Sequence, residues 1–216
     1  MDDLRFWKLI ILFVSLALIS CEKEIEDTID LNSFDEITEE DMYEFLVPAM
    51  EFDYFEVRYS GCGEIEFETI YESGTKCYGF SDTTKCIGQS DSLKSEEDGF
   101  HFDCLPSCCS YYVVSQINQT NQIYATTSDL KTFLGNIDSK SDALFLAFSH
   151  GYSYEYDSKD RAAIKEIENG FQIIAKKRVS DCSPYQVDKF LLEITTNGNI
   201  NILEQNILYK DNGSCI

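Results

Sequence analysis

The cysteines have the widest chemistry available to any residue type in this chain. A thiol can form a disulfide, hold a metal ion or accept an acyl group, and its surroundings decide which. The chain has nine of them, an odd number. Cys21 stands apart from the other eight, which could pair completely in an oxidising compartment. Those eight are Cys62, Cys77, Cys86, Cys104, Cys108, Cys109, Cys182 and Cys215.

Cys21 follows an eleven-residue, predominantly apolar run from Leu9 to Ile19, and small Ser20 precedes it directly. The run is too short to cross a bilayer as a helix, so it indicates a cleavable export signal. Leu18-Ile19-Ser20-Cys21 resembles the lipobox of bacterial lipoproteins that are cut by the type II signal peptidase. The resemblance implies a signal peptide over residues 1–20 and a mature chain that begins at Cys21, carrying a diacylglyceryl thioether and an acylated amino group.

Two alternatives to lipidation remain open. The segment could be an uncleaved membrane anchor, or an ordinary secretory signal whose Cys21 joins the disulfide pool. If Cys21 is acylated, its two or three chains anchor the protein stably to a membrane. We expect a cell-envelope location, at the outer membrane.

The residues after Cys21 bear on which face of that membrane the protein occupies. Glu22-Lys23-Glu24-Ile25-Glu26-Asp27 resembles the surface-export tag of lipoproteins from the Bacteroidota. A solvated acidic tether over residues 21–35 accounts for the same composition. Both the periplasmic and the surface face therefore remain open.

The formal charge of the chain is −22, and it is concentrated early. From Glu22 to Glu56 there are fourteen acidic residues against the single Lys23. Such a surface repels nucleic acid and anionic lipid headgroups and attracts cationic partners. We predict no nucleic-acid binding, and a cationic protein as one class of partner.

Catalytic and cofactor motifs give no usable signal. The zinc-protease, phosphate-loop, dinucleotide and EF-hand patterns are absent. His101, Cys104, Cys108 and Cys109 have zinc-like spacing, but disulfides are the simpler use of thiols in an oxidising compartment. We assign no catalytic residue, metal or cofactor. An envelope enzyme with an unrecognised site is the alternative.

Tyr152, Tyr154 and Tyr156 alternate along the chain. In an extended segment the three rings would share one face and could stack on a glycan or a peptide. More often, such a stripe covers a core or lies across a sheet. Binding through these tyrosines is therefore a hypothesis beside a structural role.

The elements that must position these residues are clearest after residue 126. Leu130, Phe133, Leu134 and Ile137 recur at helical spacing behind Ser128, a potential cap. A second helix over 143–148, behind Ser141, is apolar all round and is therefore expected to be buried. Two hairpins follow, with three-residue loops that pair Ile194 with Ile200 and Ile167 with Phe171. Together they predict a four-stranded antiparallel sheet with helices against one face.

The earlier part of the chain is less regular. Thr38, followed by Asp41, predicts one helix that ends at Pro48. We expect short, disulfide-stapled strands between residues 52 and 126, at 54–59, 64–71, 111–116 and 122–126. The register of the last hairpin brings Cys215 near Cys182, so we predict that pair. The other six cysteines have fifteen possible connectivities.

Residues 130–152, with Asp181-Cys182 and Cys215, resemble a group of Bacteroidota lipoproteins of uncharacterised function. We predict an α+β fold in which an antiparallel sheet is accompanied by a few helices and stapled by disulfides. Residues 36–216 form its single globular domain, with a cysteine-rich part over 52–126 and a helix-plus-hairpin part over 127–216. The expected function is a non-enzymatic binding or structural module held to the membrane through lipid on Cys21. An acidic inhibitor or immunity-type lipoprotein is a further alternative.

Overall fold

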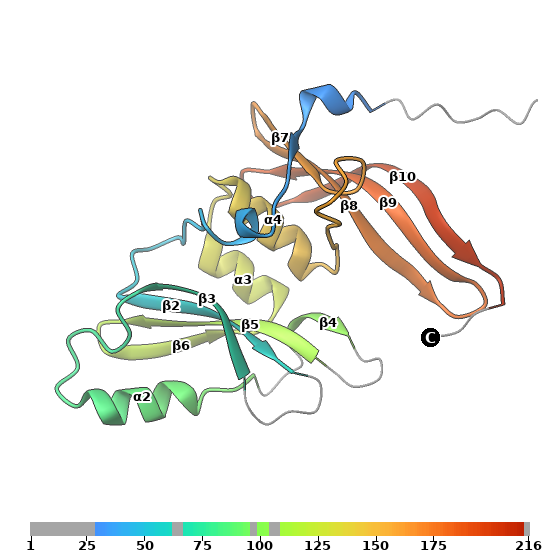
Figure 1. Cartoon of the computed structure of the whole chain (residues 1–216). Coiled ribbons are helices and arrows are strands. Elements are labelled where there is room, and N and C mark those ends of the chain that lie inside the picture. The colour runs from blue at the N-terminus through green and yellow to red at the C-terminus, as the bar shows by residue number, and fades with distance from the viewer. Residues whose placement is uncertain (1–28, 62–66, 96–98, 104–108, 214–216) are drawn as a thin grey trace, which may run out of the picture. The chain divides into compact units, whose positions relative to one another are not determined.

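The computed structural model describes residues 29–61, 67–95, 99–103 and 109–213, without the side chains of 101–103 and 109. One compact unit spans Leu31–Ile216, so it begins inside the segment assigned above to the tether. Its elements, shown in Figure 1, are η1 (Leu31–Ser33), β1 (Asp35–Glu36), η2 (Glu40–Met42), β2 (Tyr54–Ser60), β3 (Phe67–Gly74), α2 (Thr83–Asp91), β4 (Phe100–Asp103), β5 (Cys109–Ile117), β6 (Thr120–Tyr124), α3 (Thr127–Leu134), α4 (Lys140–Ser149), β7 (Ala163–Ile167), β8 (Gly170–Asp181), β9 (Tyr185–Thr195) and β10 (Ile200–Asp211).

The predicted α+β class is confirmed, with two antiparallel sheets rather than one. The first sheet has the strand order β1-β7-β8-β9-β10. Its four long strands are those expected from the two hairpins, and β1 adds a short edge by pairing with β7. In the last hairpin Ile194 lies opposite Ile200 and Leu192 opposite Ile202. The predicted three-residue register is therefore confirmed there.

The register predicted for the β7–β8 hairpin is wrong by one residue. Ile167 lies opposite Gly170 instead of Phe171, so the loop has two residues, Glu168 and Asn169. Gly170 belongs to the strand because it approaches β9 closely. A Cβ on Gly170 would lie 2.0 Å from the carbonyl oxygen of Ile194. The Asn-Gly signal therefore marked a close backbone approach and not the last residue of the turn.

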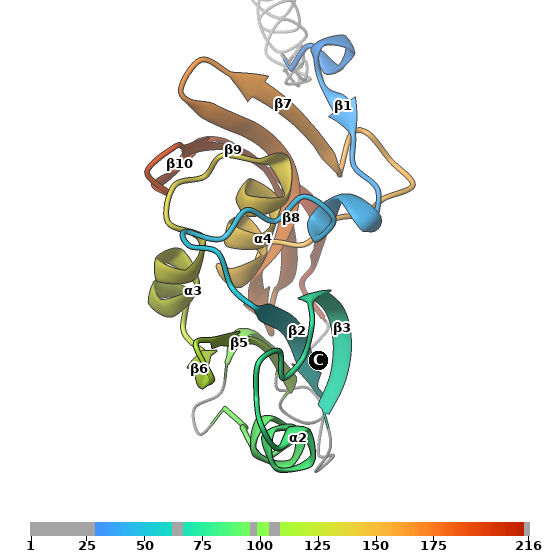
Figure 2. The same cartoon turned by 90° about the vertical axis from the view of Figure 1, so that its left-hand side faces the viewer.

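The second sheet has the order β3-β2-β5-β4, with β6 also paired to β5. These strands confirm the prediction for the cysteine-rich part as far as its residues are described. Both faces of the sheet are covered, which sequence alternation alone does not reveal. On β2, Phe55 and Val57 join the main core, whereas Glu56 and Arg58 point to the opposite face. Helix α2, which was not predicted, covers that opposite face (Figure 2).

Helix α4 is buried from Ser141 to its last residue, Ser149, as predicted. Its Phe145 packs edge-on against Phe100 of the second sheet, and the helix also contacts β8 of the first. The caps of α3 and α4 each lie two residues before the predicted caps, Ser128 and Ser141. Thr126 and Ser139 are the actual caps, each in a capping box with an aspartate three residues later.

The helix predicted over 38–48 is reduced to a single 3₁₀ turn, η2. Thr38 does bond Asp41 through both its backbone N–H and its hydroxyl, as the capping signal predicts. Beyond this turn the backbone N–H groups of Phe45 and Val47 donate to side chains of Ser141 and Asp142. The segment therefore follows the start of α4 instead of bonding to its own carbonyls.

No helix in the described part of the chain is long and apolar enough to cross a membrane.

We predict that Gly170→Ala destabilises the fold by more than about 1 kcal/mol, because its φ of +137° and the Ile194 carbonyl leave no room for a methyl group. Gly88→Ala in α2 is the matched control, since nothing lies within 4 Å of the added Cβ. It should be neutral or slightly stabilising. Urea unfolding of the two variants measures the contrast, and equal midpoints would contradict it.

Candidate functional site

A hollow of about 670 Å³ opens between η2 and β3. Both its walls come from short, well-anchored segments: residues 38–44 on one side and 70–71 on the other. It is lined by Thr38, Glu39, Glu40, Tyr43, Glu44, Ile70 and Tyr71. We call it the acidic-aromatic hollow.

The turn at η2 separates its carboxylates into two groups. Asp41 points inward, is 8% exposed, and pairs with Lys140 at the start of α4. Burial would raise the pKa of Asp41, but hydrogen bonds from Lys140 and Thr38 outweigh it and hold the pKa below its usual value. Inward packing of Asp41 leaves Glu39, Glu40 and Glu44 on the exposed side.

The aromatic wall is rigidly supported. Tyr43 and Tyr71 stack with their ring centroids 6.0 Å apart and their planes 20° apart. Phe145 of α4 packs edge-on behind Tyr43 at 5.4 Å, and Phe55 of β2 lies 6.0 Å from Tyr71. The two tyrosines therefore join the hollow to the main core, and their positions depend on both α4 and β2.

The hollow has a negative electrostatic environment. Among the described residues, Glu39, Glu40 and Glu44 form no ion pair with a basic side chain. Burial raises the pKa of Tyr156 to about 12, and the negative charge of Glu39 adds to this effect. Burial also raises the pKa of Tyr43, and Tyr111, Tyr156 and Glu39 add to this rise. No cation of the described chain compensates this charge, so the hollow is suited to receive one from outside.

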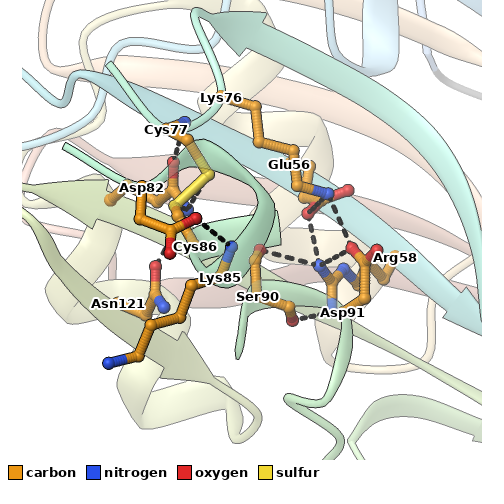
Figure 3. Close-up of a disulfide and its surroundings, with 11 residues drawn as sticks. Glu56, Arg58, Lys76, Cys77, Asp82, Lys85, Cys86, Ser90, Asp91 and Asn121 are labelled. Carbon is orange, nitrogen blue, oxygen red and sulfur yellow. Dashed lines mark hydrogen bonds and ion pairs between the residues drawn. A yellow bond between two sulfur atoms is a disulfide. The ribbon is translucent and has the colours of Figure 1, made fainter. Parts of the chain in front are cut away.

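Figure 3 shows a second cluster, on the face of the second sheet that α2 covers. Arg58 is fully buried, pairs with Glu56, and donates to the backbone oxygens of Ser90 and Leu93 at 3.1 and 2.9 Å. Lys76 reaches Glu56 at 3.2 Å from the edge. Each charge has a partner, and this cluster attaches α2 to β2. Its contacts are structural rather than those of an open site.

The Cys77–Cys86 disulfide joins the loop after β3 to α2 beside this cluster (Figure 3). Gln116 lies against it: its amide oxygen accepts from the N–H of Cys77 at 2.7 Å, and its amide nitrogen donates to Asn121 at 2.9 Å. Of the fifteen connectivities predicted as possible for the six cysteines, only the three that contain the Cys77–Cys86 pair remain.

Only some of the other cysteines lie among the residues that the structure describes. Cys182 is disulfide-bonded, but its predicted partner Cys215 lies outside the described residues. Cys62, Cys104 and Cys108 also lie outside them, as does Cys21 with the whole predicted signal peptide and lipidation site. The side chain of Cys109 is not described.

The three alternating tyrosines are placed at the core instead of on an open face. Tyr152 is 5% exposed and packs edge-on against Phe190, and Tyr154 is 9% exposed and donates its hydroxyl to the oxygen of Leu144. Tyr156 is half-buried, with its ring 6.3 Å from that of Tyr154. The buried rings of Tyr152 and Tyr154 offer no stacking surface to a glycan or a peptide, so the structural role accounts for these two residues.

Sequence reasoning identified the acidic segment but missed the hollow. The carboxylates of residues 39–44 lie within the acidic stretch that predicted a cationic partner. Ile70 and Tyr71, however, are contributed by a strand almost thirty residues later, and no local pattern links them to Tyr43. Comparisons with known protein families, with curated proteins and with solved structures find no match. The described residues contain no group of three or more potential metal ligands.

We predict that the stability of the fold decreases in acid through Glu56. Burial would raise the pKa of Glu56, but hydrogen bonds from Arg58 and Thr69 hold it below the ordinary value of 4.5. The stabilisation is therefore complete above pH 4.5 and is lost as the pH falls through the lowered pKa. Urea unfolding between pH 7 and pH 3 measures this decrease.

Glu56→Gln should lose about 3 kcal/mol at pH 7, because it leaves the fully buried Arg58 with only the half-exposed Asp91, 4.0 Å away, as a counter-charge. Its remaining pH dependence should be shallower than that of the wild type. Exposed Glu166 serves as the control, and Glu166→Gln should follow the wild-type curve. A Glu56→Gln variant with an unchanged acid slope would contradict the assignment.

Proposed function

We propose that this protein is a lipid-anchored, non-enzymatic binding protein of the cell envelope that holds a cationic protein partner at the acidic-aromatic hollow. The observation that supports the proposal best is the set of three glutamates around a tyrosine-walled hollow, none of which forms an ion pair within the described chain. Unpaired carboxylates attract a cation, and an aromatic face adds cation–π attraction.

The basic residues of the chain pair with carboxylates that are less exposed than those of the hollow. Glu155 pairs with Arg161 and Lys176, and Asp160 pairs with Lys189. Exposed carboxylates without a basic partner also occur elsewhere among the described residues, as at Glu166 and Glu168. The proposal therefore relies on the clustering of three such carboxylates beside two tyrosines.

The anchor rests on the sequence of residues 18–21 and on the odd number of cysteines. Of the two faces of the outer membrane, the acidic stretch after Cys21 favours neither. The hollow would serve equally on a periplasmic or a surface-displayed protein, because partner binding needs only an accessible, charged face.

We predict that Cys21→Ser abolishes incorporation of a labelled fatty acid and leaves the chain unprocessed, because the thiol is the acyl acceptor. Cys182→Ser is the control and should keep the label, since Cys182 is a disulfide cysteine. Metabolic labelling followed by gel analysis measures both. A Cys21→Ser chain that retains the label would refute the lipid anchor.

We predict that the full chain in detergent micelles binds a peptide of mixed lysine and arginine residues, and that binding weakens steeply between about 50 and 500 mM salt, as the Debye length shrinks severalfold. The triple variant Glu39→Gln, Glu40→Gln and Glu44→Gln should bind more weakly at low salt. Isothermal titration calorimetry measures the affinities.

The control removes the same charge elsewhere, through Asp157→Asn, Glu166→Gln and Glu168→Gln, three exposed positions outside the hollow. It separates a specific site from the general attraction of an acidic protein for cations. If the two triple variants lose affinity equally, the hollow is not the binding site.

A further inference from the structure

The two edges of the first sheet differ in length and in chemistry. One edge is β1, which consists of two acidic residues, Asp35 and Glu36. The other edge is β10, which runs over twelve residues from Ile200 to Asp211 (Figure 1). Proteins usually protect a sheet edge by keeping it short or by placing charges on it, because its outer N–H and C=O groups can pair with another strand. Strand β1 has both protections, whereas β10 is long.

Strand β10 is also apolar and exposed. None of its twelve residues is buried. Ile202, Leu203, Ile207 and Tyr209 are each between 44% and 60% exposed, and no other helix or strand among the described residues exposes more than one large apolar side chain. Within the described ranges, no strand pairs with the outer edge of β10. A long apolar edge of this kind is a surface on which a further strand can add.

The sequence of β10 is nearly symmetrical about Gln205. Two pairs of large apolar residues, at 202–203 and 207–208, lie on either side of the polar run from Glu204 to Asn206. In an antiparallel pair of two identical strands related by a two-fold axis at Gln205, apolar residues therefore lie opposite apolar residues, and polar residues opposite polar ones. The opposed residues are Leu203 with Ile207, Ile202 with Leu208, and Glu204 with Asn206. A second copy of β10 is thus complementary to the first.

Charge favours this register over the neighbouring ones. With the axis at Glu204, the two Glu204 carboxylates would lie opposite each other, and like charges directly opposite destabilise a sheet. With the axis at Asn206, the carboxylate of Glu204 would lie opposite Leu208. With the axis at Gln205, no charged residue of β10 lies opposite a like charge.

The two bulges of β10 are compatible with this arrangement. Its pairing with β9 shifts between Ile202 and Glu204, and again between Ile207 and Tyr209. The axis at Gln205 lies in the regular stretch between these two shifts. Across the axis, the first irregular segment of one copy lies beside the second irregular segment of the other, so the bends of the two strands meet each other.

From these observations we infer that two copies of this chain associate through β10, antiparallel about Gln205, and so join their first sheets into one. The second copy covers the apolar side chains of the strand and pairs with its outer backbone groups. This interface shares no residue with the acidic-aromatic hollow. The inference therefore does not depend on the proposed function.

Sedimentation equilibrium of the full chain in density-matched detergent micelles measures the association. We expect a monomer–dimer equilibrium that shifts toward the dimer as salt is added. Each copy carries a formal charge of −22, and salt screens the repulsion between the copies. Binding of a cationic partner weakens with salt, so the two kinds of association respond in opposite directions.

Exchanged charges test the register. Leu203→Glu and Ile207→Lys each replace an exposed apolar residue. Each should raise the dissociation constant of the dimer about tenfold or more, because a symmetric interface loses two apolar cross-strand pairs at once. The two variants change the net charge in opposite directions, so overall repulsion does not explain a loss that they share.

The double variant, with Leu203→Glu and Ile207→Lys in one chain, should dimerise nearly as well as the wild type. In the register about Gln205, each introduced carboxylate lies opposite an introduced ammonium of the other copy. Ile87→Lys, at a residue of α2 that is 45% exposed, is the matched control and should leave the dimer unchanged. Urea unfolding at low protein concentration checks that every variant is folded.

Three outcomes would overturn the inference. A wild-type chain that remains monomeric at every protein and salt concentration excludes the second copy and directs attention to an extended segment of another protein as the strand that adds to β10. A dimer that both single variants keep at full strength is not formed through β10, as when two chains only share a micelle. Loss in the single variants without recovery in the double variant contradicts the pairing about Gln205.

Discussion

The burial of α4 is the constraint on which the rest of this structure depends. A helix with apolar residues on every side is stable only if it is covered on every side, and one sheet covers only one face of a helix. The second sheet and the chain segment around η2 supply the remaining cover: Phe145 contacts Phe100 and Tyr43, and Phe148 contacts Tyr111. The two sheets therefore share a core because they share this helix.

The start of α4 also determines where the hollow lies. The carboxylate of Asp142 accepts from Ser139 to cap the helix and from the N–H of Val47, while Ser141 accepts from the N–H of Phe45. These bonds to α4 hold the segment after η2 in an irregular path. That path places Tyr43 against the core and its neighbouring glutamates toward solvent, so the site follows from the packing requirement of a helix almost one hundred residues away.

An element could be predicted from the sequence where the interactions that determine its structure lie within a few residues of one another. Helix α4 and the Ile194–Ile200 pairing are given by periodicity within a few residues, and both were predicted correctly. The expected helix over 38–48 failed because partners on α4 competed for its backbone donors. The Ile167 register failed because the Ile194 carbonyl, on a different hairpin, occupies the space beside Gly170. Each failure reflects a contact distant in sequence.

The two faces of the second sheet show why the site itself was harder to predict than the fold. Glu56 and Arg58 alternate with Phe55 and Val57 on β2, a pattern that ordinarily indicates one buried and one solvated face. Helix α2 instead buries the polar face, and the charges are tolerated because Ser90, Leu93 and Thr69 satisfy them. Alternation therefore reports which residues share a face, but not which face remains open to a partner.

Whether a carboxylate is buried or exposed also decides whether it needs a basic partner. The chain has thirty-nine acidic and seventeen basic side chains, so most carboxylates cannot have a basic partner of their own. Where a carboxylate is buried, as at Glu56 or Asp41, an unpaired state would cost several kcal/mol, so the few bases are needed there first. Exposed carboxylates tolerate an unpaired state in water at little cost.

Acidic residues that remain unpaired are therefore expected on open surface. Within the described chain the three glutamates at the hollow are distinguished by the Tyr43 and Tyr71 rings that line the hollow with them.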